Sequence, residues 1–237
     1  RLGFLNMQTA EDPTNQIAGN NNTVFTLQKK VLDRSNLGFI FVNRQTTGAP
    51  DFEHRQESFN RVVGVDFNLA SKSNRWTGRT FLHQSFSPDK PKEAYASGLN
   101  LEYNARVHSI SYGAVRIGDN YQSDLGFIRR TGILKNYFRY TYRIWLKSKS
   151  LRSINLSQTF YYVGQPKDNY LLTDRGNWSN IEFSFKNQAR LQLRYSNRYT
   201  YLLDSFDPTR SDAQVPLEGR TGYNYNDAEV SFQSDRS

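Results

Sequence analysis

The sequence predicts an all-β protein, an antiparallel up-and-down transmembrane β-barrel, with about twelve strands visible and the chain forming part of a larger barrel. Two observations predict this fold class. Apolar and polar residues alternate with a period of two along most of the chain. The links between alternating segments are short and long in turn, as in outer-membrane barrels, where tight periplasmic turns alternate with longer external loops.

The alternating segments give the expected strands in order. They cover residues 2–9, 22–32, 37–44, 61–69, 75–85, 94–105, 107–117, 137–147, 152–163, 178–186, 189–202 and 225–233. In one of them, Tyr95, Leu99 and Tyr103 share a face, so an apolar centre has a tyrosine at each end, as two aromatic girdles require. Several segments reach about ten residues, whereas strands of soluble sheets most often have five or six.

The links sort into two classes. Residues 33–36, 70–74, 106, 148–151 and 187–188 form the short links, and residues 10–21, 45–60, 86–93, 118–136, 164–177 and 203–224 form the long ones. A soluble β-sandwich has the same alternation within each strand, with the apolar face in a core instead of in lipid. It has no reason to sort its loops so regularly, so we prefer the barrel and keep a soluble β-rich binding domain as the alternative.

The composition of the 237 residues agrees with a barrel. Hydrophobic residues make up only 37%, yet aromatic residues reach 14%, which a disordered chain would lack. No apolar run approaches the roughly 20 residues of a transmembrane helix. Because only every second residue of a barrel strand faces lipid, a low average hydropathy is expected. There is no cysteine, which excludes disulfides and thiolate sites.

Basic residues gather on the faces opposite the apolar ones. A charge facing lipid near the bilayer midplane costs about 2–4 kcal/mol, so these side chains are expected to face the lumen. The candidates are Arg75, Arg79, Arg139, Arg143, Lys147, Arg190, Arg194 and Arg198. With a net charge of +9 they would favour anions in a pore or hold an anionic ligand such as a lipopolysaccharide phosphate. Alternatively they pair with carboxylates such as Asp66, Glu102 and Glu182 and fill the interior.

Two further function classes receive little support. Nucleic-acid binding would suit a pI of about 9.7, but we expect basic and aromatic residues on opposite strand faces, where a base and its phosphate cannot both be held. Catalysis would need partners for His54, His83 or His108; His83 and Ser85 share a strand face, but no nucleophile-elbow motif is present. We expect no enzyme activity, no metal with the spacing of a transition-metal site and no cofactor. Asp119, Asn120 and Asp124 lack the spacing of a calcium loop.

The link over residues 118–136 is long for a hairpin and carries Arg129 and Arg130 together with Phe127 and Ile128. Long loops are often functional. One hypothesis is that this loop folds into or over the lumen, with its apolar residues packed and its arginine pair on lumen carboxylates. The alternative is a disordered external loop.

Several segments in order carry a family resemblance. They are GFLNMQT at residues 3–9, NTVFTLQ at 22–28, SNLGFIFVNR at 35–44, NRVVGVDF at 60–67, IGDNY at 117–121 and LGFIRR at 125–130. Together they resemble the DUF5916 family of envelope proteins of Bacteroidota, with the clearest similarity over about the first 135 residues. The family supplies no catalytic residues to carry over.

The resemblance implies a longer protein, with a module similar to family 9 carbohydrate-binding domains before an outer-membrane barrel. We therefore expect residues 1–237 to be a fragment of the barrel domain, with the upstream periplasmic module and downstream strands absent. The expected location is the outer membrane of a Gram-negative bacterium. The expected role is a non-enzymatic pore or envelope component linked to glycan or solute handling, or alternatively an accessory barrel with a plugged lumen. Expected partners are outer-membrane lipid, lipopolysaccharide and other outer-membrane proteins, and not nucleic acid.

Overall fold

The computed structural model describes residues 1–48, 58–88, 90, 92–209 and 216–234. Its strands are β1 (Leu2–Thr9), β2 (Gly19–Val31), β3 (Ser35–Thr47), β4 (Phe59–Ala70), β5 (Trp76–Phe86), β6 (Tyr95–Asn104), β7 (His108–Ile117), β8 (Ile133–Trp145), β9 (Leu151–Gln165), β10 (Leu171–Phe185), β11 (Arg190–Leu202) and β12 (Thr221–Gln233). A single 3₁₀ turn, η1 (Pro166–Asp168), is the one helical element among the described residues. The all-β fold and its twelve strands are confirmed.

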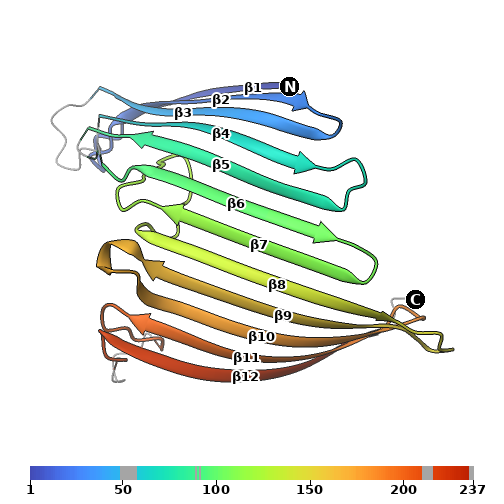
Figure 1. Ribbon diagram of the computed structural model, residues 1–237. Coiled ribbons are helices and arrows are strands. Elements are labelled where there is room, and N and C mark those ends of the chain that lie inside the picture. Colours follow the sequence, from blue (N-terminus) through green and yellow to red (C-terminus); the bar gives the residue numbers. More distant parts are fainter. Residues whose placement is uncertain (49–57, 89, 91, 210–215, 235–237) are drawn as a thin grey trace. The chain divides into compact units, whose positions relative to one another are not determined.

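The strands form one up-and-down sheet in which each is hydrogen-bonded to its neighbours in the sequence, in the order β1 to β12 (Figure 1). The strands pair in antiparallel fashion from β1 to β5 and from β8 to β12. Within the described part of the chain no pairing joins β1 to β12, so the sheet is open and the expected closed barrel is not observed. Among these residues no helix has the length and apolar character needed to cross a membrane.

One predicted long link is wrong. The segment 164–177 was expected to be a loop, but β9 continues to Gln165 and β10 begins at Leu171, which leaves only residues 166–170 between them. The reversal is made by Pro166 and η1, followed by Asn169 and Tyr170 with φ of 52° and 59°. The first residues of β10 do not alternate between apolar and polar, because Thr173 is buried although polar and Gly176 has no side chain. A register shift between Leu172 and Asp174 also interrupts the period of two.

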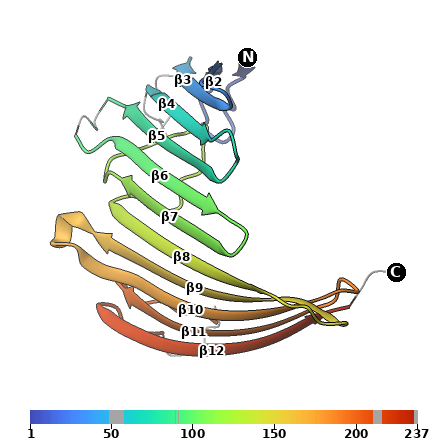
Figure 2. The same ribbon diagram turned by 45° about the vertical axis from the view of Figure 1, so that its right-hand side comes forward.

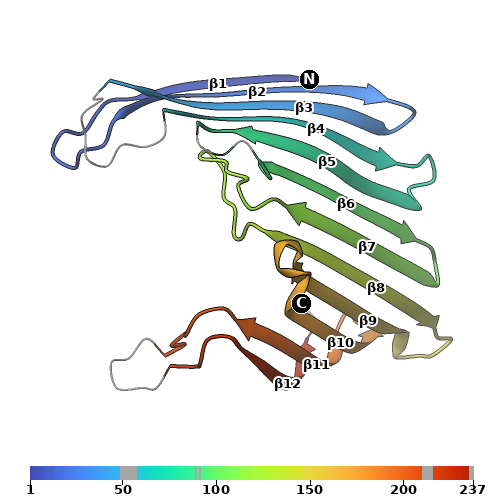
Figure 3. The ribbon, with the colours of Figure 1, turned by 60° about the vertical axis from the view of Figure 1, so that its left-hand side comes forward.

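The strands group into two compact units. Unit 1 contains Arg1–Leu101 and Ala114–Ile133, and unit 2 contains Glu102–Gly113 and Leu134–Ser237. In unit 1, strands β1 to β5 lie side by side (Figure 3). Its small core includes Val42, Val62 and Ala96, packed against Tyr121 of the β7–β8 connection. In unit 2, strands β8 to β12 lie side by side and bend along their length (Figure 2).

One face of unit 1 carries large apolar side chains that stay largely exposed among the described residues. A cross-strand row of directly paired residues runs across five strands: Leu2, Leu27, Phe39, Val65 and Leu82. Their exposed fractions lie between 36% and 69%. This face is called the apolar face of unit 1, and the opposite one, with Arg44 and Asn60, is its polar face.

Unit 2 repeats the arrangement. Its row of paired residues is Tyr142, Leu156, Ile181, Leu193 and Val230, with exposed fractions between 37% and 71%. The other face of the same strands carries Arg139, Ser157, Asn180 and Arg194. These two sides are called the apolar and polar faces of unit 2. Each unit thus has the alternation that the sequence predicts, with apolar side chains on the solvent-accessible side.

On the polar face of unit 2, an aromatic ring lies so close to Gly176 that no larger residue fits there. The Tyr161 ring lies across Gly176 and stacks on Trp178, with ring centroids 5.0 Å apart, and a Cβ at Gly176 would lie 2.2 Å from the ring. Gly176→Ala is expected to lower the free energy of unfolding by about 1–3 kcal/mol, because the rings must move. Gly38→Ala is the matched control, since a Cβ there meets its nearest atom at 3.5 Å. Urea unfolding of both variants measures the difference, and equal stabilities would contradict the packing.

Candidate functional site

The connection between β7 and β8 packs onto the polar face of unit 1. Tyr121 is buried against Val42, Val62 and Ala96, and Ile128 packs against the same cluster. The Phe127 side chain near the middle of the connection is 91% exposed. Burial raises the pKa of the Tyr121 phenol above its ordinary value, so this ring stays neutral across the physiological pH range.

A buried asparagine of β4 receives this connection. Asn60 is 1% exposed, and its Nδ2 donates to the Ser87 Oγ at 3.0 Å and to the Gln122 carbonyl oxygen at 3.2 Å. Its Oδ1 accepts from the backbone N–H of Asp124 at 3.0 Å. The Gln122 backbone N–H donates to the Ser85 Oγ at 3.2 Å. An asparagine inside the strand therefore satisfies backbone groups that would otherwise be buried without partners.

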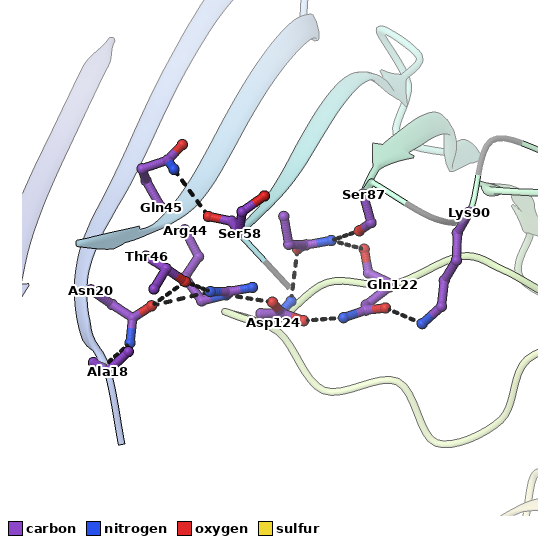
Figure 4. Close-up of polar contacts among 11 residues, drawn as sticks. Ala18, Asn20, Arg44, Gln45, Thr46, Ser58, Ser87, Lys90, Gln122 and Asp124 are labelled. Carbon is purple, nitrogen blue, oxygen red and sulfur yellow. Dashed lines mark hydrogen bonds and ion pairs between the residues drawn. The ribbon is translucent and has the colours of Figure 1, made fainter. Parts of the chain in front are cut away.

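An ion pair closes the network. The Arg44 Nε lies 2.5 Å from the Asp124 Oδ2, and the two side chains are 6% and 21% exposed. The Arg44 guanidinium also donates to Asn20 at 3.1 Å and to Thr46 at 2.8 Å (Figure 4). A charge with so little access to water is stabilised only while these acceptors remain in place. Asp124 consequently holds the connection to β3.

Lys90 of the segment after β5 also contacts the connection, and Gln122 links this lysine to Asp124 within the connection. Lys90 Nζ donates to the Gln122 Oε1 at 2.6 Å, and the Gln122 Nε2 donates to the Asp124 Oδ1 at 2.7 Å (Figure 4). The residues that hold the connection are called the latch: Asn20, Arg44, Thr46, Asn60, Ser85, Ser87, Lys90, Gln122 and Asp124. The latch joins β2, β3, β4 and β5 to one connection.

The connection is folded onto the sheet and not free of it, with Tyr121 and Ile128 packed but Phe127 exposed, and its position over a barrel lumen stays a prediction. The ion pair that holds it also differs from the expected one. The carboxylate belongs to the connection and the arginine to the strand, which reverses the expected pairing. Arg129 is exposed, and Arg130 is half-buried. Arg44 and Asn60 were not identified as site residues from the sequence. The sign of their role is that Asn22, Arg44 and Asn60 are all polar, and these three residues pair directly across β2, β3 and β4.

Unit 2 has a hollow of ≈ 430 Å³ on its polar face. It is lined by Arg139, Ser157, Thr159, Trp178, Asn180, Gln192 and Arg194. Arg139 Nε donates to the Thr159 Oγ1 at 3.0 Å, and Gln192 Nε2 donates to the Asn180 Oδ1 at 2.6 Å. Two arginines, two amides and one indole could bind a hydroxyl-rich or anionic solute.

The predicted basic residues divide into three groups. Arg79, Arg194 and Arg198 form ion pairs with Asp66, Glu229 and Asp227 respectively. Arg139 and Arg143 donate to neutral acceptors, which for Arg143 are the Ala105 carbonyl at 2.9 Å and the Asn104 Oδ1 at 3.2 Å. Arg75, Lys147 and Arg190 are exposed at or beside the short turns, where their side chains form no ion pair with the described residues.

The expected carboxylate partners are correct for Asp66 alone among the described contacts. Glu182 accepts instead from Asn155 Nδ2 at 2.8 Å. The expected separation of basic and aromatic residues is wrong at several places among the described residues; for example, Arg79 lies 5.7 Å from the ring centroid of Phe81 and Arg198 lies 4.6 Å from that of Tyr225. In each case the guanidinium covers an aromatic ring on its own face.

In the described part of the chain, Ser85 and His83 do not form a hydrogen-bonded pair. Ser85 donates its hydroxyl to the Ala94 carbonyl at 3.1 Å, and the His83 ring packs against Phe81 with centroids 4.9 Å apart. His108 Nδ1 lies 2.7 Å from the Tyr140 hydroxyl. His54 lies outside the described residues. No cluster of three or more metal-ligating side chains occurs in the described part of the chain.

Comparison with known families identifies the chain. The model of a domain of unknown function (DUF5916) matches residues 6–235. The chain belongs to the DUF5916 family. The match covers nearly all of this DUF5916 chain, so the relationship extends well beyond the first 135 residues, where the resemblance was clearest. No curated protein matches it.

Proposed function

We propose that this DUF5916 chain is the membrane-embedded part of an outer-membrane β-barrel, a non-enzymatic envelope component whose interior is narrowed by the latched β7–β8 connection. The acyl chains of the lipids would contact the apolar faces of both units, and the polar faces would line the interior of the barrel. The location would be the outer membrane of a Gram-negative bacterium of the Bacteroidota, with lipid and lipopolysaccharide as neighbours.

One observation carries this proposal: the rows of paired apolar residues, from Leu2 to Leu82 in unit 1 and from Tyr142 to Val230 in unit 2, are exposed. Contiguous apolar surface of this kind marks an interaction with protein or membrane. The soluble-sandwich alternative needs a second layer over Leu99 and Leu193, whose exposed fractions are 42% and 37%. No such layer is present among the described residues.

Folding in detergent tests the membrane location. The full-length protein should stay folded only with detergent or lipid, and its gel mobility should change on heating, because a barrel resists unfolding by the gel detergent until it is boiled. A folded monomer in buffer without detergent would refute the proposal.

Planar-bilayer recording separates the two roles of such a barrel. With the latch closed, conductance should be small or absent, because Tyr121 and its connection occupy the polar face of unit 1. The second candidate role is an anion-preferring pore, favoured by Arg139 and Arg194 in the hollow of unit 2. Large, steady anion-selective currents from the wild-type protein would favour that second role.

A further inference from the structure

Three short turns of unit 2 lie next to one another. The Arg143 backbone N–H donates to the Val107 carbonyl of the β6–β7 turn at 2.8 Å. The Lys186 N–H of the β10–β11 turn donates to the Ser150 carbonyl of the β8–β9 turn, also at 2.8 Å. These contacts place the turns at residues 105–107, 146–150 and 186–189 along a single edge of the unit, called the short-turn edge.

The short-turn edge is basic throughout. Its exposed cations are Arg106, Lys147, Lys149, Arg152, Lys186 and Arg190, and the three turns contain no aspartate or glutamate. None of these six exposed side chains forms an ion pair with a described residue, so no described carboxylate neutralises the charge of this edge. The Trp145 indole is 46% exposed at the same edge and donates to the Arg106 carbonyl at 2.8 Å. Indoles of this kind are enriched where a membrane meets water.

The opposite edge of unit 2 has a different charge. Its described connections carry Lys167 and Arg220 together with Asp168, Asp204, Asp207 and Glu218. Cations and carboxylates are therefore mixed there, as on an ordinary solvated surface. The excess of positive charge is therefore confined to the short-turn edge, where the apolar face of unit 2 also ends. Solvation alone does not explain why cations without carboxylates gather at one edge only.

We propose that the short-turn edge binds the phosphate groups of anionic phospholipids in the membrane leaflet that it meets. This inference rests on the proposed function, since it needs the apolar face to lie in lipid. Each lysine or arginine near an anionic membrane surface strengthens binding about fivefold. The six cations would then select phosphatidylglycerol-like headgroups and fix the depth at which the strands lie.

The test measures lipid selectivity of the full-length protein in phosphatidylcholine bilayers that contain spin-labelled phosphatidylglycerol or spin-labelled phosphatidylcholine. The variant Lys147→Gln, Lys149→Gln, Lys186→Gln removes three charges from the short-turn edge. The matched control, Lys135→Gln, Lys167→Gln, Arg220→Gln, removes three exposed charges from the other edge. All six substitutions are at exposed side chains, so both variants should fold.

One headgroup contacts about one cation at a time, so the wild-type protein and the control should prefer phosphatidylglycerol by about fivefold at low salt, and the edge variant, which keeps half of the cations, should show about half that preference. Raising NaCl to about 0.5 M should remove the preference of the wild-type protein, because the Debye length becomes short. A protein that inserts without headgroup preference, or an edge variant that keeps it, would overturn this inference alone. A protein that does not insert would overturn the proposed function as well.

Discussion

Asp124→Ala is expected to free the β7–β8 connection from the polar face of unit 1. The substitution leaves the Arg44 guanidinium, 6% exposed, without its charged partner. Removing one member of a buried pair costs about 3–5 kcal/mol, and because Asp124 is partly accessible we expect the lower end, about 3 kcal/mol. Urea unfolding of the protein in lipid vesicles measures this loss.

Release of the β7–β8 connection should be detectable by proteolysis and by conductance. Trypsin should cleave after Arg129 or Arg130 in the Asp124→Ala variant far faster than in the wild-type protein, and conductance in planar bilayers should rise. Asp124→Asn keeps an oxygen that can accept from Arg44 and should have a smaller effect. Leu125→Ala changes the adjacent, exposed residue and should change nothing. Equal cleavage of Asp124→Ala and wild-type protein would show that the ion pair does not hold the connection.

Leu193→Arg is expected to destabilise the protein in lipid by about 2–4 kcal/mol, because the new charge would face hydrocarbon. Gln192→Arg is the matched control, one residue away on the polar face. Gln192 pairs directly with Glu182 of β10, so an arginine there gains a carboxylate opposite it. The two variants therefore separate the two faces of β11 with the same new side chain.

Folding into vesicles, followed by the heat-dependent shift in gel mobility, measures both variants. The expected result is a large loss of folded protein for Leu193→Arg and little change for Gln192→Arg. The reverse order, or equal tolerance of both arginines, would mean that lipid does not contact the apolar face of unit 2. That outcome would contradict the proposed location.

Much of the fold could be predicted from the residues alone, because a strand places successive side chains on opposite faces. The start and end of β1 agree with the prediction to the residue, and β11 differs by one residue at its start. The prediction was wrong at the start of β10, where a register shift and Gly176 remove the alternation that marks a strand. Pro166 and η1 then make a short reversal that resembles the middle of a long loop in the sequence.

Less of the candidate site could be predicted from the sequence. The basic residues were found because they share strand faces, but their partners Asp227 and Glu229 lie on a strand that is paired only in the folded sheet. Arg44 and Asp124 are 80 residues apart, so no local pattern connects them. The adjacent Arg129 and Arg130 of the β7–β8 connection were more conspicuous in the sequence than the aspartate that holds it.

The sequence by itself determined most of the strands and their two faces, because these depend on the side-chain period, which acts locally. It did not determine every connection, since the link expected over residues 164–177 is a reversal of five residues. Only the tertiary structure decided that the β7–β8 connection lies on Val42 and Val62, that Asp124 pairs with Arg44, and that three basic turns form one edge. Such contacts join residues far apart in the chain, and they depend on which strands pair and in what register.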